Sequence, residues 1–307
     1  MQRQFATGVA FALVAVLLWG AQFPVAKSVF ATVDPYHVSL IRYGIATLLL
    51  VPIVAWHDGP AAFRYYGRAW PASLLGVIGM CGSPLLVFAG LQLTRPEHAA
   101  IIVSLQPSMT AIVDWAWRGR RPARFTVACI ATAFVGVVLV VTKGDPSVAF
   151  GKGELLGDLL VLVGAACWVV YTMGTERFGG WSALKLTLLT LIPGSIALAL
   201  ATAALVALGV ARVPTPAALA SVAGELAFLA LAGVLLAMIC WNAGNQRIGA
   251  LNAMLMLNLV PIVVFAIGFL QGQRFEAVEL AGAGLVIGAL AANNLYLRYA
   301  HARGARR

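Results

Sequence analysis

The residues best suited to bind a small molecule are aromatic and polar side chains inside apolar segments. Trp19, Gln22 and Phe23 follow the spacing i, i+3 and i+4, so they share one face of a helix. Trp168 and Tyr171 repeat this pattern 149 residues later. Polar groups in such segments are costly unless they face protein or a water-filled cavity. The pattern therefore predicts an aromatic, hydrogen-bonding cavity wall, and ordinary core packing is the alternative.

Two polar side chains lie just before mid-segment prolines. Ser104 lies three residues before Pro107, and Asn258 lies three residues before Pro261, with Met254 one turn earlier. Proline has no N–H, so the carbonyl one turn before it loses its helical hydrogen bond. A freed carbonyl can hold a substrate ammonium or open a hinge, or a neighbouring hydroxyl can satisfy it in a simple kink. We expect hinges at the two prolines and substrate contacts from the other three residues.

Four more residues complete the predicted binding site. Ser83 precedes a proline, and Phe88 and Asn242 occupy corresponding positions 154 residues apart. Asn242 lies near the end of its segment, so interfacial hydrogen bonding is the alternative for it. Arg42 lies two turns into the second apolar segment. A buried arginine needs a partner or water, so Arg42 either attracts a substrate carboxylate or ties segments together.

The sequence lacks the residue patterns of an enzyme or a metal centre. It has no GxxxxGK[ST] phosphate loop, no HExxH and no acid pair at metal-binding spacing. We therefore predict no catalytic residue, no metal and no cofactor. None of the 11 acids lies at the middle of an apolar segment, where proton-coupled transporters usually place a titratable group. This favours facilitated diffusion or exchange, and leaves Glu225 and His98 as proton-relay candidates; a cap on the fourth segment is the alternative for His98.

Composition places the chain in a membrane. Hydrophobic residues make up 61% of the 307 positions, charged residues only 10%, and the mean hydropathy is +0.91. A soluble domain carries about 25% charged residues, and a disordered chain needs low hydrophobicity. The net charge of +10 fits basic loops beside a membrane, so we expect a lipid bilayer and no nucleic acid as partner.

The apolar runs predict an all-α polytopic membrane protein with ten transmembrane helices, because each span needs about 20 residues. The predicted spans are 7–31, 35–56, 70–92, 97–117, 123–142, 154–175, 181–209, 217–244, 250–270 and 276–298.

Basic residues in the connections predict the orientation. With the N-terminus in the cytoplasm, 14 Lys and Arg residues lie on the cytoplasmic side and 6 on the other. Positive charge accumulates on the cytoplasmic side of inner membranes. We therefore expect a multi-pass protein of a bacterial inner membrane with both termini in the cytoplasm.

A weak internal repeat divides the chain into residues 1–147 and 148–307. Matches recur in order at offsets of 149 to 154, among them Trp19 with Trp168 and Pro107 with Pro261. Each half has five spans, so the second half must start from the opposite membrane face. Inverted five-helix repeats are a transporter design, with the substrate site near the midplane between them.

With these features the sequence resembles the EamA branch of the drug/metabolite transporter superfamily. The resemblance covers nearly the whole chain and rests on Leu18-Trp19-Gly20 with Lys27, Leu40-Ile41-Arg42-Tyr43, Leu105-Gln106-Pro107, and Trp241-Asn242-Ala243-Gly244-Asn245-Gln246-Arg247-Ile248-Gly249-Ala250 leading to Leu259-Val260-Pro261. The family often has Gly-Glu where this chain reads Gly119-Arg120 and Gly272-Gln273, so no role of that acid carries over. Within the family, the bacterial amino-acid exporters, including the YddG-type exporters of aromatic amino acids, are the most similar group.

The resemblance and the polar midplane together imply an amino-acid exporter. We expect alternating access and broad specificity for neutral and aromatic amino acids, with export of drugs, nucleosides or other small metabolites as the alternative. The small-residue motif Gly284-x-x-x-Gly288 predicts close helix packing, in a monomer or a weak homodimer.

Overall fold

The computed structural model describes residues 2–119, 121–145 and 154–304. The predicted boundary between the halves at residues 147 and 148, and Arg120, lie outside these ranges. Within them every regular element is a helix, as predicted. The elements are α1 (Gln2–Val29), α2 (Pro35–His57), η1 (Pro60–Phe63), α3 (Ala69–Gly76), η2 (Val77–Gly82), α4 (Ser83–Leu93), α5 (Pro96–Val103), α6 (Gln106–Arg118), α7 (Arg124–Thr142), α9 (Glu154–Thr175), η3 (Glu176–Phe178), α10 (Ala183–Ala207), α11 (Pro216–Ser221), α12 (Ala223–Ala230), η4 (Leu231–Leu236), α13 (Ala237–Ile248), α14 (Ala250–Met256), α15 (Leu259–Leu270) and α16 (Ala277–Gly304).

The helices are long and apolar enough for a multi-pass membrane protein. In the described part of the chain, nine helical stretches of 19 to 26 residues meet the length and hydropathy of a membrane span. They correspond to the first nine predicted spans. The tenth predicted span falls in α16, whose apolar part, Ala277–Asn293, is shorter.

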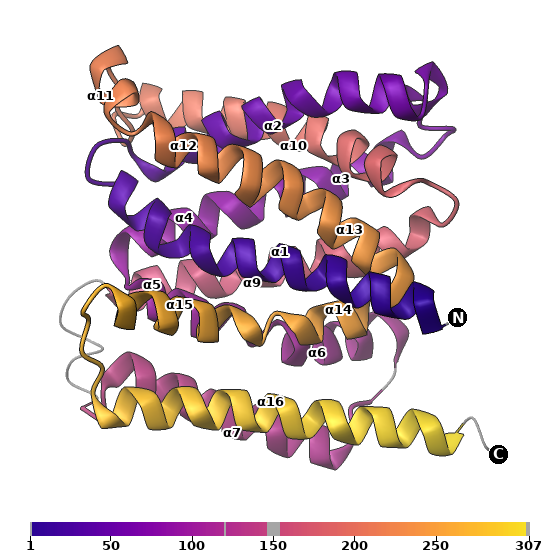
Figure 1. Ribbon diagram of the computed structural model, residues 1–307, viewed down its shortest axis with the longest axis vertical. Coiled ribbons are helices and arrows are strands. Elements are labelled where there is room, and N and C mark those ends of the chain that lie inside the picture. Colours follow the sequence, from indigo (N-terminus) through magenta and orange to yellow (C-terminus); the bar gives the residue numbers. More distant parts are fainter. Residues whose placement is uncertain (1, 120, 146–153, 305–307) are drawn as a thin grey trace.

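The helices lie side by side, and the N- and C-termini emerge at the same end of the bundle (Figure 1). Helix α1 packs along α13 and α15, and α9 packs along α4 and both helices of the fourth span. Helix α2 packs against α10, and α7 pairs with α16 at one edge of the bundle.

Four of the predicted spans are interrupted near their middle. The third and eighth spans each contain a π-helical turn, η2 and η4, which start 154 residues apart. The fourth span stops at Val103 and restarts at Gln106, and the ninth stops at Met256 and restarts at Leu259. Both restarts come just before the two prolines that we predict to be hinges, Pro107 and Pro261. A proline fits the first turn of a helix but not its interior.

Glycines set the closest approaches between helices. A Cβ on Gly157 would lie 2.8 Å from the carbonyl oxygen of Gly90, and a Cβ on Gly244 would lie 3.0 Å from that of Gly8. Between α7 and α16, a Cβ on Gly282 would lie 2.7 Å from the carbonyl oxygen of Gly136. Such distances leave no room for a side chain, so these backbones are in direct contact.

The predicted packing motif in the last span makes no close contact within the chain, and its other predicted role, in a homodimer, stays a prediction. Nothing lies within 4 Å of a Cβ built on Gly284 or Gly288. Gly282 makes the contact instead, because its backbone faces α7, and residues two and six positions later in a helix face other directions.

We expect Gly282→Ala to destabilise the bundle by about 1–3 kcal/mol, because a methyl group there overpacks the backbone contact with Gly136. Gly284→Ala is the matched control on the same helix, and it should leave stability unchanged or raise it by up to about 1 kcal/mol through helix propensity. Thermal unfolding of the two purified variants in one detergent measures the difference. Equal loss in both would contradict the assigned register.

Candidate functional site

A cavity of about 70 Å³ lies between the four interrupted spans and the helices α1, α2 and α9. Six of the predicted site residues line it: Trp19, Gln22, Arg42, Ser83, Phe88 and Trp168. The remaining lining residues are Phe23, Tyr43, Pro84, Val87, Val103, Gln106, Gly233, Met238, Leu257 and Val260. Val103 and Leu257 each lie four residues before a proline. Because proline has no N–H to donate, the carbonyls of these two residues lack that helical hydrogen bond.

Arg42 brings a positive charge into this cavity. Its side chain is only 3% exposed, and one nitrogen, Nη1, donates a 2.7 Å hydrogen bond to Oε1 of Gln22. The guanidinium carbon lies 3.7 Å from the centroid of the Phe88 ring, a favourable cation–π distance. Nε has no hydrogen-bond partner, and no acidic side chain of the described residues forms an ion pair with Arg42.

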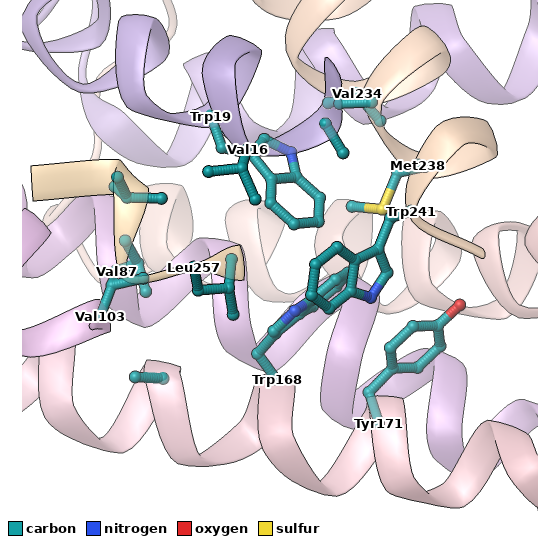
Figure 2. Packing of buried hydrophobic residues seen from close by; sticks show 14 of the residues in the cluster. Val16, Trp19, Val87, Val103, Trp168, Tyr171, Val234, Met238, Trp241 and Leu257 are labelled. Carbon is teal, nitrogen blue, oxygen red and sulfur yellow. The ribbon is translucent and has the colours of Figure 1, made fainter. Parts of the chain in front are cut away.

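Three tryptophans from three helices, Trp19, Trp168 and Trp241, meet in the core (Figure 2), and the first two line the cavity. The rings of Trp19 and Trp168 are 5.2 Å apart and nearly perpendicular, and Trp241 lies 5.0 Å from Trp19 and 6.2 Å from Trp168. These are preferred geometries for aromatic pairs. The indole nitrogen of Trp19 donates to the carbonyl of Gly233 in the η4 turn at 3.0 Å. That of Trp168 has no partner, so it can donate to a molecule in the cavity.

Gln106 lines the cavity in the position predicted for Ser104. The hydroxyl of Ser104 donates to the carbonyl of Ile101 at 2.6 Å and faces its own helix. The amide nitrogen of Gln106 donates to the carbonyl of Ala165 at 3.1 Å, whereas its buried oxygen has no partner. The break between α5 and α6 changes which residue faces inward. The sequence signal for this break is Pro107, which follows it.

The other four predicted contacts, Tyr171, Asn242, Met254 and Asn258, are buried but do not line the cavity. Tyr171 and Asn242 belong to a polar cluster between α9, α10 and α13. Asn242 donates to the hydroxyl of Tyr171 at 3.2 Å and to that of Thr187 at 2.8 Å. Tyr171 also pairs with Thr190 at 3.3 Å. These side chains satisfy one another, so they leave no group directed toward the cavity.

A second polar cluster lies at the end of the bundle opposite the termini. Asp158 and His98 are 5% and 0% exposed, and the hydroxyl of Thr94 contacts both. No side chain forms a cap hydrogen bond on α5, so His98 does not cap the fourth span. Glu225 lies in the first turn of α12 and is exposed, away from the other polar groups named here.

Comparison with known proteins identifies the family. The model of the EamA-like transporter family matches residues 6–142 and 155–295. The chain belongs to the EamA-like transporter family. It is therefore a transporter of the drug/metabolite type, a class that agrees with the argument against an enzyme.

Relatives of this EamA-like transporter span nearly its whole length. It is 33% identical over 299 residues to the uncharacterized transporter YrdR of Bacillus subtilis, covering 96% of this chain and 93% of the relative. It is 23% identical over 286 residues to the protein PecM of Dickeya dadantii, covering 91% and 90%. A crystal structure with 20% identity superposes with a TM-score of 0.69 over 96% of this chain and 98% of that one, which supports the fold.

We expect the double variant Arg42→Met, Gln22→Leu to be at least as stable as the parent, and about 1 kcal/mol more stable where the apolar pair packs well. A buried charge without an acidic partner costs free energy that apolar residues of similar volume do not. Thermal unfolding in detergent measures the change. Arg118→Met is the comparison, because Arg118 pairs with Asp114 and Glu176 at the surface and its loss should cost at most about 1 kcal/mol. A drop of several kcal/mol in the double variant would make Arg42 a structural tie rather than a binding group.

Proposed function

We propose that this transporter exports small amphipathic metabolites that carry a carboxylate, chiefly neutral and aromatic amino acids, by alternating access. The observation that carries the proposal is the guanidinium of Arg42, which is buried at the cavity wall without an acidic partner among the described residues. A guanidinium binds a carboxylate by charge-assisted hydrogen bonds, often two in parallel. A substrate carboxylate would therefore supply the charge that the protein itself does not.

The rest of the wall suits the other two parts of an amino acid. The free oxygen of Gln106 and the hydroxyl of Ser83 are acceptors for an ammonium group. Trp19, Trp168 and Phe88 supply flat apolar surface for a side chain. Such surface discriminates weakly, since one methylene in an apolar pocket changes binding by about 1–3 kcal/mol. Broad specificity follows.

Support for alternating access comes from contacts that recur between corresponding positions of the two halves. The contact of Arg42 with Gln22 corresponds to that of Thr190 with Tyr171, at offsets of 148 and 149. Thr47 and Ser195, 148 residues apart, hydrogen-bond to each other at 2.7 Å, as residues beside a two-fold axis would.

On this basis we propose that residues 1–147 and 148–307 are inverted repeats. The cavity beside Arg42 would then have a closed counterpart at the buried cluster of Tyr171, Asn242 and Thr190. In alternating access the two would exchange states, so that the cluster opens when the cavity closes.

We further propose that both termini lie in the cytoplasm of a bacterial cell. They emerge at one end of the bundle (Figure 1), the end whose connections carry the excess of Lys and Arg. Trp56 and Trp70 lie at the same end and are 91% and 77% exposed. This is the position expected of side chains at a membrane interface.

Counterflow in liposomes tests the substrate class. We expect unlabelled phenylalanine inside the vesicles to accelerate entry of labelled phenylalanine, and phenethylamine, which lacks the carboxylate, to be a poor substitute. Arg42→Met should lose about ten- to a hundredfold in apparent affinity, the value of a hydrogen bond to a charged group. Arg247→Met is the control, because Arg247 bonds the carbonyl of Ala243 on its own helix, away from the cavity. Equal transport of the amine, or stimulation only by nucleosides or cations, would refute the carboxylate assignment.

Two neighbouring substitutions test which side chain faces the substrate. Gln106→Leu should weaken transport about tenfold, because a buried acceptor for the ammonium is lost. Ser104→Ala should change it less than about twofold, because that hydroxyl bonds only its own helix. The concentration dependence of exchange in liposomes gives both values. The opposite ranking would restore the site predicted from the sequence.

A further inference from the structure

The buried cluster of Thr94, His98 and Asp158 has the connectivity of a proton-binding site. It joins the end of α4, the first turn of α5 and the second turn of α9. The hydroxyl of Thr94 donates to Oδ1 of Asp158 at 2.6 Å and lies 3.2 Å from Nδ1 of His98. Nδ1 also lies 3.7 Å from Oδ2 of Asp158.

With Asp158 ionised, these contacts assign the hydrogens of the cluster. A hydroxyl has one proton to donate, and with Asp158 ionised that proton is directed to the carboxylate. Nδ1 of His98 must then carry its own proton and donate it to the Thr94 oxygen. Nε2 of a neutral His98 is left as a lone pair, and this atom, like Oδ2 of Asp158, is buried without a hydrogen-bond partner.

The charged side chains around this cluster contact groups other than Asp158. The ammonium of Lys27 on α1 donates to the carbonyls of Leu91, Gln92 and Thr94 at 2.6–2.9 Å, and Glu154 of α9 acts on it electrostatically. Arg95 contacts Glu97 and, from α16, Glu279. Lys143, which follows α7, lies near Glu276 and Glu279. Among the described ion pairs, only His98 can therefore neutralise Asp158.

The site occurs at one end of the bundle only. At the corresponding positions 154 residues later, Thr94 and His98 are replaced by Ile248 and Asn252. The amide of Asn252 bonds the carbonyl of Ile248 at 2.7 Å, and neither residue titrates. The helices α4, α5 and α9 that hold the cluster also supply Phe88, Val103 and Trp168 to the cavity.

We infer that Thr94, His98 and Asp158 bind one proton at Nε2 of His98, and that the bound proton holds the outer ends of α4, α5 and α9 together. With the proton bound, a buried imidazolium faces a buried carboxylate and the cluster is neutral. Without it, an unpaired carboxylate remains in a low-dielectric junction, which favours opening to water. Slower opening in acid is the consequence for transport, and that part rests on the proposed function.

Nitrogen NMR of histidine-labelled protein tests the site without any substrate. The chain has four histidines, and spectra of His37→Asn, His57→Asn and His98→Asn assign them. We expect neutral His98 to carry its proton on Nδ1 and to take up a second proton at Nε2 in acid. A neutral form with the proton on Nε2, or no uptake of a proton at Nε2 in acid, would overturn the assignment whether or not amino acids are transported.

Counterflow at equal pH on both sides tests the consequence. Exchange by the parent should rise about tenfold as the pH rises and the proton leaves Nε2 of His98, equivalent to about 1.4 kcal/mol in the cost of opening. In His98→Asn, which introduces the residue found at the corresponding position, the profile should be flat. His37→Asn is the matched control, because His37 also pairs with an aspartate, Asp34, at 2.7 Å near the same end, and it should keep the parental profile. A parental profile in His98→Asn would refute the coupling, whereas silence of the parent toward amino acids refutes the proposed function and leaves the NMR result standing.

Discussion

The interior of a bilayer offers no hydrogen-bonding partner, and this constraint decides where the chain can depart from a regular helix. The breaks before Pro107 and Pro261 and the turns η2 and η4 all occur in helices of the bundle core. There the irregular backbone is covered by protein or faces the cavity. One of its carbonyls, that of Gly233, accepts the indole proton of Trp19. Irregular backbone would be too costly against lipid, but here its free polar groups form part of the cavity wall.

The same constraint explains the contacts between glycines. Helices in lipid gain little from the hydrophobic effect, so close backbone packing must hold them. Gly90 meets Gly157 where α4 crosses α9, and Gly8 meets Gly244 where α1 crosses α13. Each crossing joins a helix from the first half of the chain to one from the second half. The helices that cross also supply residues to the cavity wall. The positions of Trp19 and Trp168 therefore depend on contacts about three turns away, at Gly8 and Gly157, and that of Phe88 depends on a contact two residues away, at Gly90.

The sequence was sufficient for the fold class, because spans of some 20 apolar residues admit few alternatives to helices. It also placed Trp19, Gln22 and Arg42 on inward faces, and these three line the cavity, because they lie on uninterrupted helices where spacing gives the face directly. It failed at Ser104, because the helix break before Pro107 changes the facing residue to Gln106. It did not identify Gly282 as the residue that contacts α7, since helical spacing identifies a small-residue stripe but not the neighbouring helix that the stripe faces. Tyr171 was predicted at the cavity wall and Asn242 near the end of its segment, yet their mutual hydrogen bonds could not be inferred from either segment alone.

The charge of Arg42 has no equivalent in the second half, where Thr190 occupies the corresponding position. This asymmetry bears on how an empty carrier behaves. Enclosing a guanidinium without an anion costs several kcal/mol, whereas a bound carboxylate neutralises it and removes most of that cost. On the proposed function, the loaded cavity closes more readily than the empty one. Exchange of one substrate for another would then be faster than the return of an empty carrier. Because Arg42 is held by a neutral partner, Gln22, and by the face of Phe88, its preference for an anion is preserved; an acidic residue in either place would remove it.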